Sequence, residues 1–564
     1  MTNKPAIRHR APGNLEALPS TLHPVLRRVY ASRGISTPDE LTLDLKSLLP
    51  PTLKGLPEAC AELTRALNEK YRIVIAGDYD ADGATSTALA VSTLRALGAE
   101  VDFVVPDRFK MGYGLSPELV QEAVQAGAQV LVTVDCGIAS HAGVAAARAQ
   151  GLRVIITDHH LPGPTLPDAH AIVNPNCLGE VFPSKHLAGV GVMFYLLMAL
   201  RSHLRDQGWF KSHTEPNLSE GLDLVALGTV ADMVRLDHNN RILVAQGLRR
   251  IRAGRARPGI NALLQAAGRT LKTVSASDLG FAAGPRLNAA GRLTDMRLGI
   301  RCLLTQTEAE ATLCATELDR LNRERRSLQG QMEEGALDLA VGNTDVGVCL
   351  FDSEWHEGVV GLVASRLKEK LHRPVIAFAR AQEAGLLKGS ARSIPGLHIR
   401  DALAAVDSQN PGLIERFGGH AMAAGLSLRE SNLKIFSATY DAICRQWLDE
   451  AALEQVIETD GELAQDEFST GTVQALEQGG PWGQGCPEPR FEGLFEIVSA
   501  RVVGESHVKY QLRNASGQIV PAIHFRGIDR LTASGPVRLV YRPTINRYLG
   551  NEQLELFVEN LLPA

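Results

Sequence analysis

The hydrophobic positions between residues 71 and 160 form four short apolar runs, and amphipathic stretches separate them. The runs read YRIVIAG, VDFVVPDR, AQVLVTVDCG and LRVIITDHH, and each has the length of a buried strand. The segments between them are helix-like. One example is TSTALAVSTLRALG, and another is SPELVQEAVQAG, which begins with a serine followed by a proline, as helices often do. Apolar strands that alternate with helices predict a parallel, doubly wound α/β sheet.

The pattern changes twice more along the chain. A helical region follows the first sheet, and its last part, 308–340, reads as one long charged helix. A second α/β segment begins near residue 345 and contains glycine-rich loops. From about residue 457, short strands with turns predict a small closed β-barrel. We therefore divide the chain into a helical lead-in (1–50), a parallel-sheet lobe (51–235), a helical connector with the long helix (236–340), a second α/β lobe (341–455) and a barrel (456–564).

Composition narrows the class of protein. The chain has 564 residues, of which 45% are hydrophobic, and a net charge of −5, which argues against a uniformly basic nucleic-acid-binding surface but permits a local basic groove. Its eight cysteines include no C-x-x-C pair, as expected for reduced residues in the cytosol. The start of the chain lacks the apolar core of a secretory signal, and the longest apolar run, 187–200, is short for a membrane span. We expect a cytoplasmic protein that is not bound to a membrane.

Acidic and histidine side chains follow three of the four predicted strands. Because ligands bind outside the carboxyl ends of strands in open α/β sheets, these side chains are expected at one edge of the sheet. The set consists of Asp78, Asp80 and Asp82 after the first strand, Asp135 after the third, and Asp158, His159 and His160 after the fourth.

Two explanations exist for such a set. A single aspartate is most often a turn residue or a helix cap, and two adjacent histidines can form a polar turn. Several carboxylates brought together, however, repel one another unless a cation neutralises them. Oxygen ligands with one imidazole suit Mn²⁺ or Mg²⁺, and two such ions can support phosphoryl transfer. On a strand, Asp80 and Asp82 would lie roughly 6.6 Å apart, so we expect them to serve different ions.

Several motifs carry a family resemblance. DYDADG (78–83), VTVDCG (132–137), TDHH (157–160) and LGTVADMV (227–234) resemble, in order and spacing, the motifs of the DHH phosphoesterase superfamily. FGGHAMAAG (417–425) resembles the glycine-rich motif of the DHHA1 domain. With RFKMGYG, GPRLNAAGR and GQGCPEPRF, these motifs make the chain similar to the RecJ single-strand-specific 5′→3′ exonucleases. The resemblance implies a DHH lobe, a long connecting helix, a DHHA1 lobe and a C-terminal OB-type barrel.

The resemblance also implies roles for the acidic set. It implies two divalent ions, Mn²⁺ or Mg²⁺, held by Asp78, Asp80, Asp82, Asp135, His159 and Asp232. Asp78 and Asp80 would hold one ion and the other three the second, with Asp135 bridging both. His160 would face the scissile phosphate, and Asp158 would orient its neighbours. In the pyrophosphatase branch of the superfamily, a histidine upstream of the paired aspartates occupies the corner that Asp78 fills here.

Residues that would bind DNA lie outside the acidic set. Each has a simpler explanation that involves no DNA. The arginines of 241–257 would form a solvated helix face, and the glycine-rich motifs would be tight turns. His420 would be a buried hydrogen-bonded histidine, and core positions would account for the barrel aromatics Tyr510, Phe525, Tyr541 and Tyr548. Under the resemblance, the DNA- and phosphate-binding residues are Arg108, Arg286, Asn288 and Arg292 along the strand path, and Ser390, Arg392, Gly418, Gly419 and His420 on glycine-rich turns that receive the 5′ end.

The family resemblance implies a metal-dependent exonuclease. It would degrade single-stranded DNA from the 5′ end to 5′-mononucleotides, in DNA recombination and repair, as a monomer that works with single-strand-binding protein and a helicase. One alternative is a DHH phosphodiesterase of short oligonucleotides or cyclic dinucleotides, but those relatives are shorter than this chain with its extra barrel. Another is a degenerate scaffold that only binds DNA, against which the intact acidic set argues.

Overall fold

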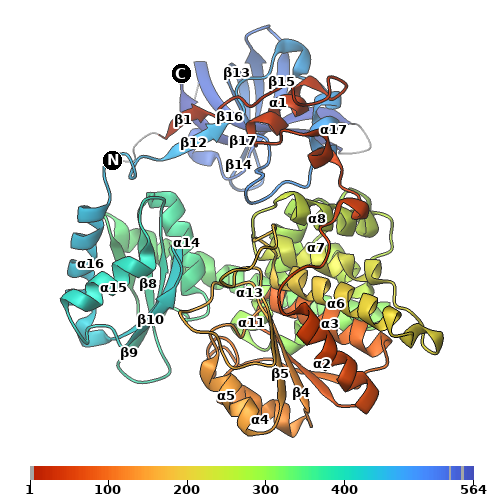
Figure 1. The fold of residues 1–564 in the computed structure, drawn as a ribbon. Coiled ribbons are helices and arrows are strands. Elements are labelled where there is room, and N and C mark those ends of the chain that lie inside the picture. The colour runs from red at the N-terminus through yellow and green to blue at the C-terminus, as the bar shows by residue number, and fades with distance from the viewer. Residues whose placement is uncertain (1–4, 532–534, 548–551) are drawn as a thin grey trace. The chain divides into compact units, whose positions relative to one another are not determined.

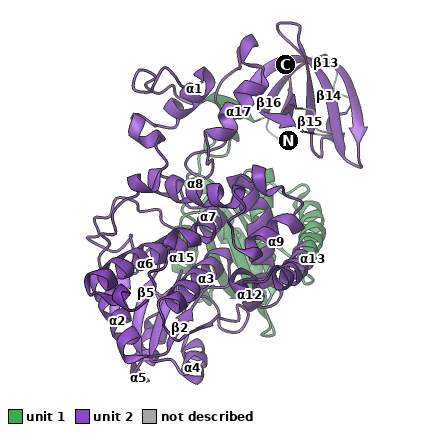
Figure 2. Ribbon diagram, turned by 90° about the vertical axis from the view of Figure 1, so that its right-hand side faces the viewer, with its two compact units in different colours: residues 1–9, 323–459 green, residues 10–322, 460–564 purple. Residues whose placement is uncertain are grey.

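The computed structural model describes residues 5–531, 535–547 and 552–564. The chain forms two compact units, which Figure 2 shows in different colours. One unit contains residues 1–9 and 323–459, and the other contains residues 10–322 and 460–564. Among the described residues, no helix has the length and apolar character needed to cross a bilayer.

The predicted parallel sheet is confirmed in the larger unit. Its five strands lie in the order β3-β2-β4-β5-β6, and every neighbouring pair is parallel. The order reverses between β2 and β4, which makes this the switch point where a crevice opens at the carboxyl ends of the strands. The strands are β2 (Ile73–Ala76), β3 (Val101–Val104), β4 (Val130–Val134), β5 (Arg153–Thr157) and β6 (Ala171–Val173).

Helices cover both faces of this sheet. Every residue of β2 and β4 is therefore buried, which explains why these strands read as continuous apolar runs rather than alternating ones. One face packs on α2 (Leu56–Glu69), α3 (Ala81–Ala96) and α6 (Gly189–Asp206). The other packs on α4 (Pro117–Gln125) and α5 (His141–Ala149), which Figure 1 shows beside β4 and β5.

A helical region continues from the sheet. Its first helix, α7 (Leu222–Ala231), is apolar all round because it is packed among α3, α6 and α8. The predicted long charged helix is confirmed as α13 (Glu308–Ala340). Between them lie α8 (His238–Arg252), α9 (Pro258–Ala266), α10 (Ala276–Asp278), a π-helical turn η6 (Leu279–Ala283), α11 (Gly284–Leu293) and α12 (Arg297–Leu304).

The smaller unit is the second α/β lobe. Its sheet has the order β10-β11-β9-β8-β7, and only β7 and β8 are parallel. A short parallel pair joins β1 (Ala6–His9) to β12 (Val456–Thr459), so part of the lead-in is strand. The other elements are β7 (Val348–Phe351), α14 (Val360–Leu371), β8 (Val375–Arg380), β9 (Leu386–Arg392), α15 (Ile399–Gln409), β10 (Arg416–Gly419), β11 (Ala423–Arg429) and α16 (Leu433–Trp447).

The predicted C-terminal barrel is also confirmed. It closes in the order β13-β14-β15-β17-β16. Tyr510 and Tyr541 are buried in its core, so these two cannot stack on a bound strand, whereas Phe525 is 47% exposed. Tyr548 lies outside the described residues. The strands are β13 (Phe491–Val503), β14 (His507–Asn514), β15 (Ile519–His524), β16 (Gly535–Asn546) and β17 (Gln553–Pro563).

An ion pair joins the N-terminal segment to the start of the barrel region. Helix α1 (Pro24–Ser32) shares a hydrophobic core with the barrel and with α17 (Thr470–Gln478). Next to it, the Arg33 guanidinium donates to both Asp460 oxygens at 2.7 and 3.0 Å, and each side chain is 2% exposed. Residues 10–50 therefore pack as part of the larger unit.

Removal of the Asp460 carboxylate should destabilise this unit. Asp460→Ala leaves the buried Arg33 guanidinium without its partner, so we expect a loss of about 3 kcal/mol and a lower thermal midpoint. The matched control is Glu496→Ala, which breaks an exposed pair with Arg513 on the barrel and should leave the midpoint unchanged. Equal midpoints for Asp460→Ala and wild type in a calorimetric scan would contradict the assignment.

Candidate metal centre

Four segments bring the predicted acidic set to the switch point of the sheet. The loop after β2 and the first turn of α3 supply three aspartates, and Asp135 is the residue after β4. The loop after β5 supplies an aspartate and two histidines, and the C-cap of α7 is Asp232. Among the described residues, three groups have ligand atoms within 4.8 Å of one another: Asp78, Asp80 and Asp135; Asp82, His159 and Asp232; and Asp135, His159 and His160.

The strand-spacing argument for Asp80 and Asp82 is wrong, because β2 ends at Ala76 and both residues begin a helix. Asp80 is the N-cap of α3, and its Oδ1 accepts from the backbone N–H groups of Asp82 and Gly83 at 2.9 and 3.0 Å. The Asp82 carboxylate instead accepts from two N–H groups at the start of α6, at 2.6 and 3.0 Å. The two carboxylates thus belong to different ligand groups, because different helix N-termini orient them.

Glycines allow the backbone to approach these carboxylates closely. A Cβ atom on Gly189 would lie 2.5 Å from the Cβ of Asp135, and one on Gly228 would lie 2.8 Å from Oδ1 of Asp82. Asp135 itself has a φ of 59°, in the left-handed region that aspartate tolerates better than most residues. The site therefore depends on backbone positions that carry no chemistry themselves.

The two histidines have different surroundings. His159 Nε2 lies 3.1 Å from Asp135 Oδ1 and 3.5 Å from Asp232 Oδ2, so it points into the acidic cluster. His160 Nδ1 lies 2.7 Å from Asp158 Oδ1. Since an ionised carboxylate only accepts, Nδ1 carries the proton of this bond.

Asp158 is fully engaged with the protein. Its oxygens accept from the backbone N–H groups of Ile138, His159 and His160, as well as from the His160 ring. Burial alone would raise its pKa, but the hydrogen bonds from His160 and the positive charges of His160 and His159 together outweigh burial and lower it. This geometry fits a residue that orients its neighbours rather than a metal ligand.

In the described part of the chain, two of the other carboxylates each have an oxygen without a hydrogen-bond partner. Oδ1 of Asp78 and Oδ1 of Asp135 are buried and accept no hydrogen bond within the part of the chain that the structure describes. Burial, followed by repulsion from neighbouring carboxylates, raises the pKa values of Asp78, Asp135 and Asp232 well above the usual range, and that of Asp82 to about 7. Such groups need a proton or a cation, and oxygens with an imidazole suit Mn²⁺ or Mg²⁺. The residues present therefore fit divalent ions.

The GPRLNAAGR motif holds the loop before α3. Asn288 Oδ1 accepts from the backbone N–H of Ala81 at 2.8 Å, and a Cβ on Gly291 would collide with the carbonyl oxygen of Tyr79. Arg286, predicted to line the strand path, instead forms a largely buried 2.7 Å ion pair with Asp319. Arg108 lies at the expected edge, with its guanidinium 4.7 Å from the centroid of the Tyr79 ring.

The predicted phosphate-binding turns of the second lobe are strands in the structure. Ser390 and Arg392 lie on β9, and Gly418 and Gly419 end β10. Arg392 Nη1 donates to Ser390 Oγ at 3.0 Å, and the first turn of α14 packs closely on this pair. His420 is exposed, so the alternative of a buried histidine is wrong. A phosphate-binding role for these residues stays a prediction.

Neither a solvated helix face nor a DNA-binding group describes all the arginines of 241–257. Arg241 is 3% exposed, and its guanidinium lies 5.6 Å from the centroid of the Tyr30 ring, so it is neither solvated nor open to DNA. Arg257 pairs with the buried Asp223 at 3.4 Å. These two side chains connect packed elements.

Other residues of the site were missed by the sequence analysis. Asn174 and Asn176 donate to the backbone carbonyls of His160 and His159 at 2.9 and 2.6 Å, and no pattern in the sequence indicates this. The hydroxyl of Tyr113 lies 3.1 Å from the Asp135 carbonyl oxygen. Tyr113 belongs to the RFKMGYG motif, so the motif was a usable signal.

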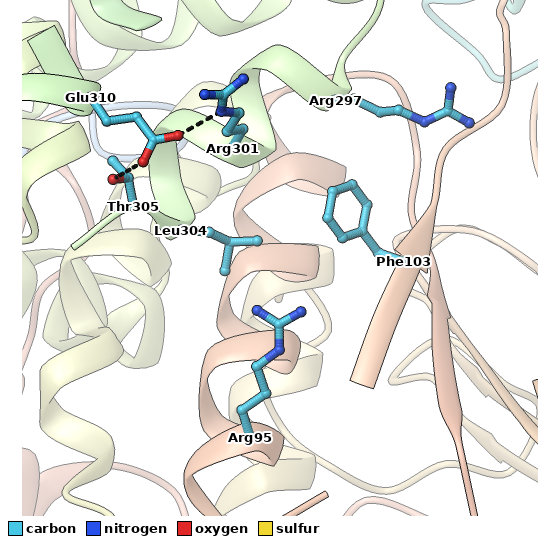
Figure 3. Close-up of a pocket in the computed structure, with 7 residues that line it drawn as sticks. All are labelled: Arg95, Phe103, Arg297, Arg301, Leu304, Thr305 and Glu310. Atoms are coloured by element: carbon cyan, nitrogen blue, oxygen red, sulfur yellow. Dashed lines mark hydrogen bonds and ion pairs between the residues drawn. The ribbon is translucent and has the colours of Figure 1, made fainter. Parts of the chain in front are cut away.

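A separate pocket of about 390 Å³ does not belong to this site (Figure 3). Two of its three arginines pair with acids: Arg301 bonds to Glu310 at 2.6 Å, and Arg297 bonds to Glu122 at 2.8 Å. Its third arginine, Arg95, donates to the backbone carbonyl of Val101 at 2.9 Å, so the paired acids neutralise only part of the positive charge of the pocket. Its lining consists of Arg95, Phe103, Arg297, Arg301, Leu304, Thr305 and Glu310.

Comparison with known proteins extends these observations. Family models match residues 72–229 (DHH family, N-terminal domain), 343–446 (DHHA1 domain) and 459–560 (RecJ OB domain). The single-stranded-DNA-specific exonuclease RecJ of Escherichia coli is 50% identical over 571 residues, covering 99% of each chain. The crystal structure of Thermus thermophilus RecJ with Mn²⁺ has a TM-score of 0.83 at 32% identity and covers 99% of this chain and 80% of that one. The same protein with Mg²⁺ has a TM-score of 0.77 at 30% identity, covering 99% and 79%.

The raised pKa values predict how pH acts on stability. The folded, metal-free protein binds these protons more tightly than the unfolded chain, whose aspartates have a pKa of about 3.9. Their contribution to stability is therefore fully present below about pH 4 and is lost as pH rises through the folded pKa, which is about 7 for Asp82. Because a divalent ion replaces the protons, the gain in thermal midpoint from Mn²⁺ should grow between about pH 5 and about pH 8. A gain that does not change with pH would contradict this account.

The close approach at Gly189 predicts a sensitive position. Gly189→Ala would push the start of α6 away from Asp82 and Asp135, so we expect Mn²⁺ affinity to fall by about 10-fold or more in calorimetric titration. Gly163→Ala is the control, because a Cβ at Gly163 meets only one atom, at 3.8 Å, and should leave the affinity unchanged. Wild-type affinity in Gly189→Ala would show that the close packing does not support the site.

Proposed function

Because the chain belongs to the RecJ family of single-stranded-DNA-specific exonucleases, we propose that it hydrolyses single-stranded DNA from the 5′ end and releases 5′-mononucleotides. The observation that carries the proposal is the cluster of buried carboxylates at the switch point of the sheet, some of whose oxygens lack a hydrogen-bond partner among the described residues. Such a set is suited to phosphodiester hydrolysis with divalent ions.

The geometry supports a proposal for two ligand sets. We assign Asp78, Asp80 and Asp135 to one ion, supported by their mutual distances. Two divalent ions, Mn²⁺ or Mg²⁺, would generate a nucleophile at neutral pH and stabilise the charge that develops on the reacting phosphate. We assign the second ion to Asp82, Asp135, His159 and Asp232.

His160 is the residue we assign to the scissile phosphate. Burial lowers the pKa of His160, but the hydrogen bond with Asp158 and the negative charges of Asp158, Asp78 and Asp80 together outweigh burial and raise it, which favours the imidazolium. With Nδ1–H held by Asp158, a proton on Nε2 can be donated to a phosphate oxygen. A donor aimed at developing negative charge stabilises the transition state. Asp158 acts through His160 and is a positioning residue.

The DNA-binding assignments are adjusted to the contacts. We propose that Arg108 and Arg292 contact phosphates near the acidic cluster, because the charge of Arg108 acts on Asp78 and that of Arg292 acts on the neighbouring Tyr79. Arg286 and Asn288 act instead by holding α11 and the loop before α3 in place. In the second lobe, we propose that Ser390, Arg392, Gly418, Gly419 and His420 receive the 5′ phosphate, supported by the serine–arginine pair beside the first turn of α14.

The biological setting rests on the family resemblance. We propose a monomeric cytoplasmic enzyme that acts in DNA recombination and repair, on strands made available by a helicase and covered by single-strand-binding protein. These roles explain a single-strand-specific activity, because recombination and repair require trimming of exposed strands.

A time course on labelled strands tests the proposal. With Mn²⁺ or Mg²⁺, a 5′ label on a long single strand should appear first in a mononucleotide, while a 3′ label stays in long products until late. Asp80→Ala and Asp135→Ala should each lower kcat by at least about 100-fold, since each removes a ligand rather than an outer partner. Asp168→Asn is the control, because its side chain is 86% exposed.

Three outcomes would contradict the proposal. They are early release of the 3′ label, cleavage restricted to oligomers of a few residues or to cyclic dinucleotides, and full activity in the Asp80→Ala protein. The first would overturn the polarity, the second the substrate, and the third the metal centre.

A further inference from the structure

Tyr113 contacts both Asp135 and His160, two residues of the acidic site. It lies in the loop between β3 and α4, and its side chain is 50% exposed, so the residue is not there to fill the core. Its hydroxyl oxygen is nevertheless placed between two parts of the site. It lies 3.1 Å from the Asp135 carbonyl oxygen and 3.0 Å from His160 Nδ1.

The chemistry of the acceptors determines the direction of these hydrogen bonds. A carbonyl oxygen only accepts, so the single Tyr113 proton is donated to Asp135. The proton on His160 Nδ1 is directed to Asp158, at the shorter distance of 2.7 Å. The hydroxyl therefore does not compete with Asp158 for the imidazole.

The position of the hydroxyl relative to the imidazole supports a steric role. The oxygen is 3.0 Å from Nδ1 and 3.4 Å from Nε2 of His160. The two ring nitrogens make hydrogen bonds in different directions, each away from the ring. An oxygen this close to both nitrogens therefore lies in the hydrogen-bonding direction of neither. The Tyr113 ring meets the imidazole edge to face, at 71° with centroids 5.5 Å apart. The hydroxyl thus touches the ring without blocking the direction in which Nε2 reaches a phosphate.

Besides Tyr113, the imidazole of His160 has Asp158 and His159 as neighbours: Asp158 accepts its hydrogen bond, and the centroid of the His159 ring lies 4.4 Å away. Asp158 holds a single atom of the imidazole, and Asn174 holds only the backbone carbonyl of His160. Tyr113 contacts the ring from another side and is itself fixed to the Asp135 backbone. Asp135 and His160 come from different strand ends, so this contact links two groups that must act on the same phosphate.

We propose that Tyr113 is a positioning residue whose hydroxyl fixes the orientation of the His160 imidazole relative to Asp135. This inference rests on the proposed function, since it concerns the residue assigned to the scissile phosphate. It differs from a role as a stacking platform for a nucleobase, for which the aromatic ring would suffice and the hydroxyl would be dispensable.

A double-mutant cycle on single-stranded DNA separates these roles. Tyr113→Phe keeps the ring and removes the hydroxyl, so kcat should fall by about 10-fold with KM unchanged, the lower end of effects seen for outer partners. In a His160→Ala background, Tyr113→Phe should have no further effect, because it acts through His160. Single-turnover assays with enzyme in excess keep the slow variants measurable. Tyr71→Phe is the control, because it also removes a tyrosine hydroxyl from this lobe, one bonded to the exposed Glu69.

The possible outcomes decide the inference. Wild-type kcat in Tyr113→Phe, a change confined to KM, or losses that multiply in the double variant would each overturn it. Those results would leave the proposed function standing, provided that the wild-type protein degrades the strand. A wild-type protein without this activity would overturn the proposed function and the inference together.

Discussion

Electrostatic repulsion among buried carboxylates is the constraint on which the catalytic lobe depends. Asp78, Asp82 and Asp135 are each at most 4% exposed, and two of their oxygens accept no hydrogen bond among the described residues. Buried negative charge of this kind is unfavourable unless a proton or a cation is present. The pKa values of Asp78 and Asp135 are raised for the same reason, since burial and the neighbouring carboxylates disfavour the charged form. The fold therefore has to hold a set of groups that repel one another when no cation is bound.

The structure meets this constraint with backbone geometry. The switch point between β2 and β4 brings the loops to one edge of the sheet, and two helix N-termini direct Asp80 and Asp82 into different groups. Gly189 and Gly228 let the neighbouring helices approach, and Asp158 accepts three hydrogen bonds from His159 and His160, which hold the histidine loop. None of these structural features contacts a substrate, but each fixes the position of a functional atom. Stability of the lobe and function of the site are therefore linked through the same contacts.

The sequence predicted the parts of the site that depend on local sequence patterns. Strand periodicity predicted the sheet, and acids after successive strands predicted that Asp135 and His159 would meet. Family motifs were needed for Asp232, because it reaches the cluster from a helix. The strand-to-helix boundary was misplaced, so Asp80 and Asp82 were given strand geometry when both begin α3. The partner of Arg286 was not predictable, because Asp319 lies on α13 and only the packing of α11 on that helix brings the two together. Gly189 was missed for the same reason, since its neighbour Asp135 belongs to a different element.

The central claim is that the acidic cluster holds two ions rather than serving as a set of caps and turns. A crystal structure of the protein grown with Mn²⁺, with anomalous scattering collected at the manganese edge, tests it most directly. The account predicts two anomalous peaks, one among Asp78, Asp80 and Asp135 and one among Asp82, His159 and Asp232. A single peak that leaves Asp78 and Asp80 without a metal contact, or no peak at this edge of the sheet, would contradict it.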